Sequence, residues 1–136
     1  MLLRPLTNRN DLAGCDRVEN REEFRDQGIL PEALVNYLVR LGWSHGDQEI
    51  FSPKDIVEHF ALEQVGKAGA VFDREKLLWL SHAWIKAAAP ERLAAALLPF
   101  LARILGSAAF AAATLDPARL AAIAASLKER SRSLVE

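Results

Sequence analysis

The chain has 136 residues, with 17 Lys and Arg against 18 Asp and Glu, and 51% of its residues are hydrophobic. This composition is typical of a globular protein, and the single cysteine, Cys15, excludes an internal disulfide. The net charge of −1 excludes a protein that binds nucleic acid with its whole surface. No apolar run reaches membrane length and no signal peptide is evident, so we expect a cytoplasmic protein without a membrane partner.

Charge is unevenly divided between the two halves of the chain. Residues 1–72 contain 8 basic and 12 acidic side chains, whereas residues 73–136 contain 9 and 6. If the protein binds a polyanion, the C-terminal half is therefore the better candidate.

In chain order, residues 1–18 lack any periodicity and predict an irregular arm. Every later segment predicts a helix, because each begins at a capping residue or a proline and continues with apolar residues at helical spacing. These segments begin at Asn20, Pro31, Ser52, Asp73, Pro90 and Asp116. No stretch alternates with a period of two, so the predicted fold is all-α, a multi-helix bundle of about six or seven helices. The expected core comprises Leu34, Leu38, Leu41, Leu77, Leu80 and Trp84.

Alanine dominates residues 87–125, where we expect helices that pack with little buried surface per residue. The change in composition near Ala88 and Pro90 predicts a boundary between two helical subdomains, residues 19–88 and 89–136.

The residue types that carry chemistry form no catalytic pattern. His45, His59 and His82 have no metal-binding spacing, so polar surface or capping roles are favoured over metal ligation. Cys15 lies in the irregular arm with no basic residue fixed beside it. No phosphate-binding or nucleophile motif occurs in the sequence.

Three tryptophans, Trp43, Trp79 and Trp84, could stack on RNA bases. Trp79 and Trp84 occur at helical spacing beside leucines, which favours a core position for both.

Three stretches are similar to a known family, the third more faintly than the others. GILPEALVNYLVRLGWSHGDQEIF, residues 28–51, closely resembles the segment that follows the second catalytic signature of bacterial glutamyl-tRNA synthetases. AVFDREKLLWLSHAWIK, residues 70–86, resembles the block that precedes the tRNA-binding helical domain of this family. More faintly, residues 120–136 resemble a helix of the anticodon-binding region.

The resemblance also implies what is missing. Nothing here resembles the first ATP-binding element of the family, and residues 11–15, Asp-Leu-Ala-Gly-Cys, stand where its basic second element would lie. We therefore expect a chain that is inactive alone and holds no cofactor, since ATP and Mg would belong to the missing catalytic domain.

The resemblance implies three regions: an arm over residues 1–18, a stem-contact-like helical unit over 19–88, and the truncated start of an anticodon-binding bundle over 89–136. Met1 and the degenerate arm suggest a standalone reading frame, although an excised fragment or a remnant of a duplicated synthetase gives the same sequence. The implied partner is tRNA, specifically tRNA-Glu.

For tRNA contact the resemblance assigns Arg130, flanked by Lys128 and Arg132, with Arg40, Lys67 and Lys76 as further candidates; a solvated helix face explains the first three equally well. The prominent residues Glu32, Trp43 and Phe72 are assigned to capping and packing. Two alternatives stay open: a helical protein-interaction module that self-associates or binds a synthetase, and a remnant without function.

Overall fold

The computed structural model describes residues 21–66, 69–106 and 116–136. Within these ranges the chain forms six α-helices, one short 3₁₀ helix and no strand, so the all-α prediction is confirmed. The helices are α1 (Arg21–Asp26), α2 (Pro31–Arg40), α3 (Pro53–His59), the 3₁₀ helix η1 (Leu62–Gln64), α4 (Arg74–Ala87), α5 (Pro90–Leu105) and α7 (Pro117–Leu127). The predicted arm, with Cys15, and the candidate Lys67 lie outside the described residues.

Capping geometry confirms the predicted starts of α3, α4 and α7, whereas the predicted start at Asn20 lies outside the described residues. At α3 the Ser52 side chain accepts a hydrogen bond from the Asp55 backbone, and the Asp55 carboxylate accepts one from the Ser52 backbone. Asp73 and Asp116 accept backbone bonds at the first turns of α4 and α7. Proline stands in the first turn of α2, α3, α5 and α7, where its missing N–H has no helical partner to lose.

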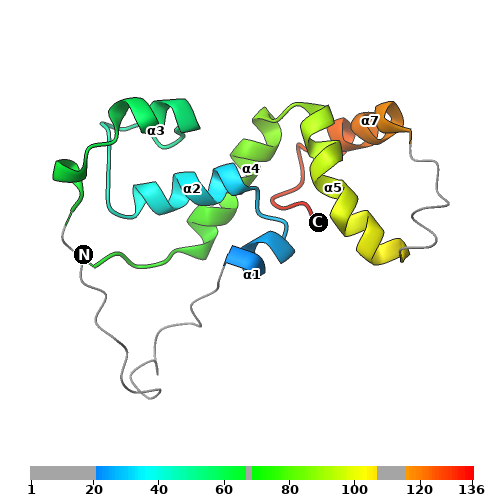
Figure 1. Cartoon of the computed structure of the whole chain (residues 1–136), viewed down its shortest axis with the longest axis horizontal. Coiled ribbons are helices and arrows are strands. Elements are labelled where there is room, and N and C mark those ends of the chain that lie inside the picture. The colour runs from blue at the N-terminus through cyan, green and yellow to red at the C-terminus, as the bar shows by residue number, and fades with distance from the viewer. Residues whose placement is uncertain (1–20, 67–68, 107–115) are drawn as a thin grey trace, which may run out of the picture.

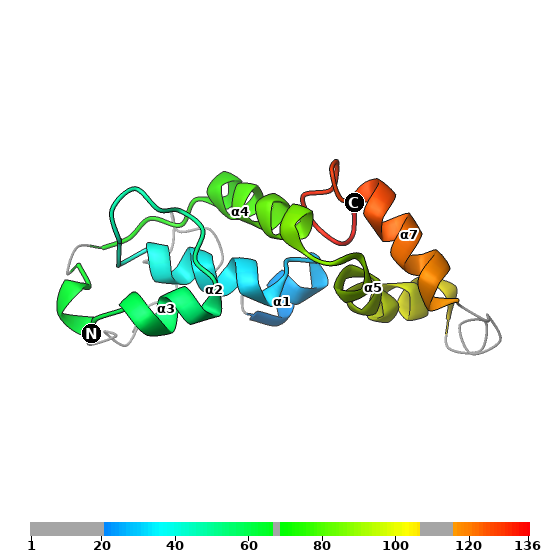
Figure 2. The same cartoon turned by 90° about the horizontal axis from the view of Figure 1, so that it is seen from above.

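The helices pack mainly as two pairs, α2 beside α4 and α5 beside α7 (Figures 1 and 2). Helix α4 leads directly into α5, and residues 128–136 fold back from α7 toward the turn between α1 and α2. There the Leu134 backbone N–H donates to the Gly28 carbonyl at 2.9 Å. Gly28 has φ +77°, and a Cβ at this position would lie 2.7 Å from the Leu134 nitrogen. Only glycine permits this close approach.

One cluster of buried residues joins both helix pairs. It contains Phe24, Ile29, Leu30, Ala33, Tyr37, Leu77, Leu80, Ile85, Leu93 and Ala124. Of the predicted core, Leu77 and Leu80 are fully buried, and Leu34, Leu41 and Trp84 pack against the cluster. The core therefore continues across the change in composition near residue 88.

Two core predictions are wrong. Leu38 is 53% exposed and Trp79 is 49% exposed. The buried face of α2 is centred on Ala33, Asn36 and Tyr37, and Leu38 lies roughly 150° around the helix from that centre. Asn36 occupies that face as a fully buried polar residue because its side chain makes three hydrogen bonds: to the Glu49 carbonyl, the Phe51 N–H and the Trp84 indole.

The packing roles of Trp43 and Phe72 are confirmed, whereas Glu32 does not cap. Trp43 is buried, and the Phe72 ring lies 5.3 Å from the Tyr37 ring. The Glu32 carboxylate instead forms an ion pair with Arg92 of α5 at 3.1 Å, so it links α2 to α5.

Candidate nucleic-acid interface

The segment that follows α7, residues 128–132, contains three of the predicted tRNA contacts. Helix α7 ends with the Lys128 N–H bonded to the Ala124 carbonyl, and the next turn is closed by a bond from the Arg130 N–H to the Leu127 carbonyl. Four residues further on, Leu134 is bonded to Gly28. The segment is therefore held at both ends.

One face of α4 fixes this segment along its length. His82 Nδ1 lies 2.9 Å from the Ser131 carbonyl oxygen, a contact that requires a proton on Nδ1. The Lys128 ammonium donates to the carbonyl of Lys86 at 3.0 Å. These bonds place Lys128 and the backbone of Ser131 directly beside α4.

Ion pairs complete the contact between α4 and the segment. The Lys86 ammonium lies 2.9 Å from the Glu129 carboxylate, and this hydrogen bond holds the pKa of Glu129 below its usual range. The Arg132 guanidinium pairs with Glu75 of α4 at 3.7 Å and with Glu136 at 3.6 Å. Within the described residues, the exposed Arg130 side chain forms no ion pair.

The charge of this surface is only slightly positive. Four cations, Lys86, Lys128, Arg130 and Arg132, stand against the three carboxylates of Glu75, Glu129 and Glu136. Because three of the cations already have protein partners, an RNA phosphate must compete with those partners. The geometry therefore suits a small number of phosphate contacts and a modest affinity.

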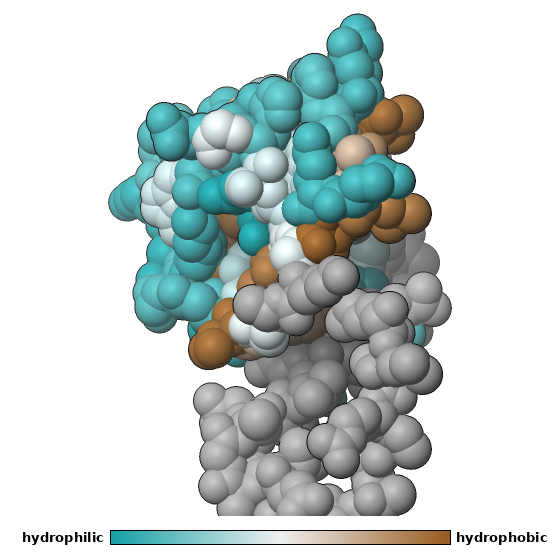
Figure 3. Space-filling model, turned by 90° about the vertical axis from the view of Figure 1, so that its left-hand side faces the viewer, coloured by the Kyte–Doolittle hydropathy of each residue, from teal (hydrophilic) through white to brown (hydrophobic). Residues whose placement is uncertain are grey.

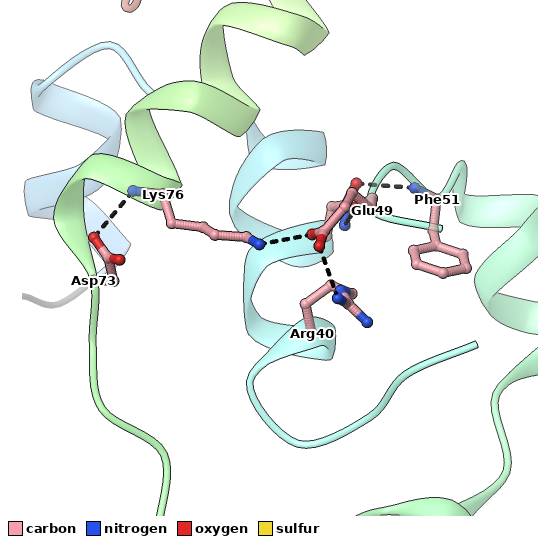
Figure 4. Close-up of polar contacts among 6 residues, drawn as sticks. Arg40, Glu49, Phe51, Asp73 and Lys76 are labelled. Atoms are coloured by element: carbon pink, nitrogen blue, oxygen red, sulfur yellow. Dashed lines mark hydrogen bonds and ion pairs between the residues drawn. The ribbon is translucent and has the colours of Figure 1, made fainter. Parts of the chain in front are cut away.

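Two other predicted cations meet at a different place. The Glu49 carboxylate binds Arg40 at 3.0 Å through one oxygen and Lys76 at 2.9 Å through the other (Figure 4). The hydrogen bond from Lys76 and the nearby Arg40 guanidinium hold the pKa of Glu49 below its usual range, against the opposing effect of burial. Arg40 is only 17% exposed, so this cluster ties the loop after α2 to α4.

The end of the molecule that contains α3 has the opposite charge. Four carboxylates at this end are exposed or half-buried: Asp47, Asp55, Glu58 and Glu63. They outnumber Lys54, the one lysine among the described residues there. Figure 3 views this end, where hydrophilic residues cover most of the coloured surface and hydrophobic residues form separate patches. Acidic side chains repel RNA phosphates, so this end is a poor candidate for the interface.

Aromatic rings stack at the same end. The His45 ring lies 4.6 Å from the His59 ring and 5.9 Å from the Trp43 ring, with interplanar angles of 11° and 16°. Across the described ranges, no group of three or more His, Cys, Asp or Glu side chains could hold a metal ion. None of the helices described is long and apolar enough to cross a membrane.

The sequence alone did not identify which face of α4 contacts the segment. Glu75, Trp79, His82 and Lys86 are separated by four, three and four positions, which places them on one face of the helix. This spacing could have predicted a shared contact face on α4. The face was missed because Trp79 also fits the apolar pattern that predicts a core position.

Comparisons with known proteins agree with this architecture. The family described as tRNA synthetases class I (E and Q), catalytic domain, matches residues 15–79. Over 116 residues the chain is 55% identical to the glutamate–tRNA ligase of Geobacter sulfurreducens, an alignment that covers 83% of this chain and 23% of the relative. It is 59% identical over 78 residues to the corresponding ligase of Syntrophobacter fumaroxidans, covering 57% of this chain and 17% of that one.

A solved structure gives the same result for the fold. The glutamate–tRNA synthetase of Elizabethkingia anophelis matches with a TM-score of 0.61 and 31% identity over 82% of this chain and 21% of that chain. The present chain thus spans about a quarter of the length of the relatives that it matches. In sequence and in fold, this chain is a homologue of one segment of the bacterial glutamate–tRNA ligases.

Proposed function

We propose that this chain is a tRNA-positioning unit that binds the anticodon or anticodon-stem region through residues 128–132 and carries out no chemistry itself. The observation that supports this most directly is the fixed placement of Lys128 and Arg132 beside α4, with Arg130 between them in the chain, in a homologue of ligases whose names specify tRNA. Cations held in this way displace counterions from RNA phosphates without first having to be ordered.

The other three predicted cations are weaker candidates. Arg40 and Lys76 already share the Glu49 carboxylate, so their binding to a phosphate would break a contact between the loop after α2 and α4. Lys67 lies outside the described residues and stays a prediction from the resemblance.

A salt series with labelled tRNA tests the proposal. We expect binding that is micromolar or weaker, with log K falling against log salt at a slope of about −2 to −3 for three or so phosphates. The double variant Arg130→Ala/Arg132→Ala removes two of these contacts and brings the slope to about −1. The double variant Arg25→Ala/Lys54→Ala, which loses the same charge from α1 and α3, serves as the control and keeps the original slope.

Binding that is equal in both double variants would contradict the proposed site. The same protein incubated with glutamate, ATP and tRNA is expected to give no aminoacylation or ATP–pyrophosphate exchange above a blank. Turnover that persists after removal of contaminating host synthetase would contradict the positioning role.

A protein-interaction module is the second candidate, and a groove between α5 and α7 favours it. The groove has a volume of about 700 Å³ and is lined mainly by small or apolar side chains, among them Ala94, Leu98, Ala118 and Ala121. A mass that rises with concentration in RNA-free solution, together with no shift of labelled tRNA, would favour this candidate over RNA binding.

A further inference from the structure

We infer that Trp79 is the stacking platform of this surface and takes an unpaired base of the RNA whose phosphates lie on residues 128–132. The inference rests on the proposed function and adds the class of group that is bound, a nucleobase free of its pairing partner.

The placement of Trp79 follows from the face of α4 on which it lies. Three of the four residues on that face bond to residues 128–132: Glu75 to Arg132, His82 to the Ser131 carbonyl, and Lys86 to Glu129. Trp79 stands between Glu75 and His82 on the same face. Its side chain therefore lies beside the segment that the other three hold.

The exposure of Trp79 separates it from the two other tryptophans. Trp43 is 2% exposed, and its indole donates to the Gln64 side chain. Trp84 packs against the core and donates to Asn36. Trp79 is 49% exposed, which leaves a large part of its surface open to solvent. An indole is costly to expose, so a half-exposed tryptophan beside cations is a candidate binding residue.

The neighbouring charges suit a nucleic acid. An aromatic ring flanked by cations can stack on a base while those cations contact the adjoining phosphates. Lys86 lies about two turns after Trp79 on this face of α4, and Arg132 pairs with Glu75, about one turn before it; the side chains of Lys86 and Arg132 are 46% and 51% exposed. Base stacking does not depend on the identity of the base, so Trp79 contributes affinity for unpaired RNA with little sequence preference.

Substitution of Trp79 tests the inference with labelled tRNA as the probe. Trp79→Leu keeps an apolar side chain but removes the stacking face, and we expect binding to weaken about 5- to 150-fold. Trp79→Phe keeps a ring and should stay within about threefold of the unmodified chain. The salt slope should not change in either variant, because stacking displaces no counterion. Ile104→Ala, which alters an exposed apolar residue of α5, is the matched control and should bind normally.

A fully paired RNA duplex separates stacking from a general effect on the surface, since it offers no free base. Trp79→Leu should bind this duplex as the unmodified chain does, and equal losses for duplex and tRNA would overturn the inference. Addition of tRNA should quench the tryptophan fluorescence of the unmodified chain. This quenching should disappear in Trp79→Phe, a conservative variant that is expected to bind tRNA but lacks the indole at position 79. Quenching that survives in Trp79→Phe would also overturn it.

The remaining outcomes distinguish the two proposals. If the unmodified chain binds tRNA and Trp79→Leu binds it equally well, the stacking role is wrong and the positioning function stands. If the unmodified chain does not bind tRNA at low salt, both fail. If Trp79→Leu instead lowers the mass of a self-associated species in RNA-free solution, Trp79 belongs to a protein contact and the stacking role is overturned.

Discussion

The two helix pairs of this chain are held together by different means. Around α2 and α4, large side chains pack with a buried polar hub at Asn36, and Glu49 joins a loop to both helices through its backbone and its carboxylate. Between α5 and α7 the contact depends on smaller groups such as Ala94, Ala121 and Ala124, and an apolar groove stays open beside them. We therefore expect the α2–α4 pair to be the more strongly stabilised of the two.

Besides the shared core cluster, polar contacts join the α5–α7 pair to the α2–α4 pair. The Glu32–Arg92 pair connects α2 to α5, and the Leu134–Gly28 bond anchors the chain beyond α7 on the turn before α2. The surface proposed to bind RNA lies within this junction, because residues 128–132 rest on α4. We therefore expect RNA binding to depend on the junction more than on the α5–α7 contact itself.

The largest effect is expected in the α2–α4 pair. Leu80→Ala removes a side chain with no exposed surface from the main core, and the free energy of unfolding should fall by about 2 to 5 kcal/mol. Leu98→Ala, at the groove beside α5 and α7, changes a residue that is 37% exposed and should cost less than half as much. Urea denaturation of both variants measures the difference, and equal costs would show that the two pairs are packed alike.

A substitution at Gly28 tests the junction. Gly28→Ala forces a residue with a Cβ into a positive φ and against the Leu134 backbone, so we expect a loss of about 1 to 3 kcal/mol. Gly46 also has a positive φ, but a Cβ added there would meet no atom within 4 Å. Gly46→Ala therefore serves as the control for backbone strain alone. Denaturation that is identical in the two variants would contradict the docking of Leu134.

The Glu49 cluster should contribute a smaller, pH-dependent amount. Because the pKa of Glu49 is lowered in the folded chain, its carboxylate stabilises the fold above the ordinary pKa of glutamate. This contribution is lost as pH falls through the lowered pKa. Glu49→Gln should therefore cost about 0.2 to 1 kcal/mol at neutral pH and nothing in strong acid. Glu58→Gln, on α3, is the control; a cost for Glu49→Gln that persists in acid would show that ionisation is not its cause.

The smallest effect is expected at Leu38. This side chain is more than half exposed, so Leu38→Ala should change the free energy of unfolding by no more than about 0.5 kcal/mol. A cost of several kcal/mol in a urea melt would place Leu38 inside the core, as the leucine spacing of α2 suggests.

Local signals in the sequence were sufficient for the helices. Prolines and capping residues such as Ser52 and Asp73 act within one turn, so their effect can be predicted without knowledge of the fold. The rotation of α2 could not be predicted in this way. It depends on Asn36, a polar residue that is buried only because partners 13, 15 and 48 positions away satisfy its amide.

The candidate interface was predictable only in part. Lys128, Arg130 and Arg132 were found because they lie together in the chain and in a segment that resembles the family. Their contact with α4 joins positions more than 40 residues apart, and no local pattern specifies it. Arg40 and Lys76 illustrate the converse, since two basic residues that are plausible RNA contacts by sequence are paired with one carboxylate in the fold.

Hydrogen–deuterium exchange with and without tRNA tests the central claim most directly, because it compares the regions of the intact chain in one experiment. We expect slower exchange in residues 128–136 and in α4, which face each other at the proposed interface. We expect no change in α3, whose end of the molecule is acidic, or in the first turns of α5 and α7 along the groove. Protection confined to α3 or to the groove, or no protection anywhere, would contradict the proposed RNA surface.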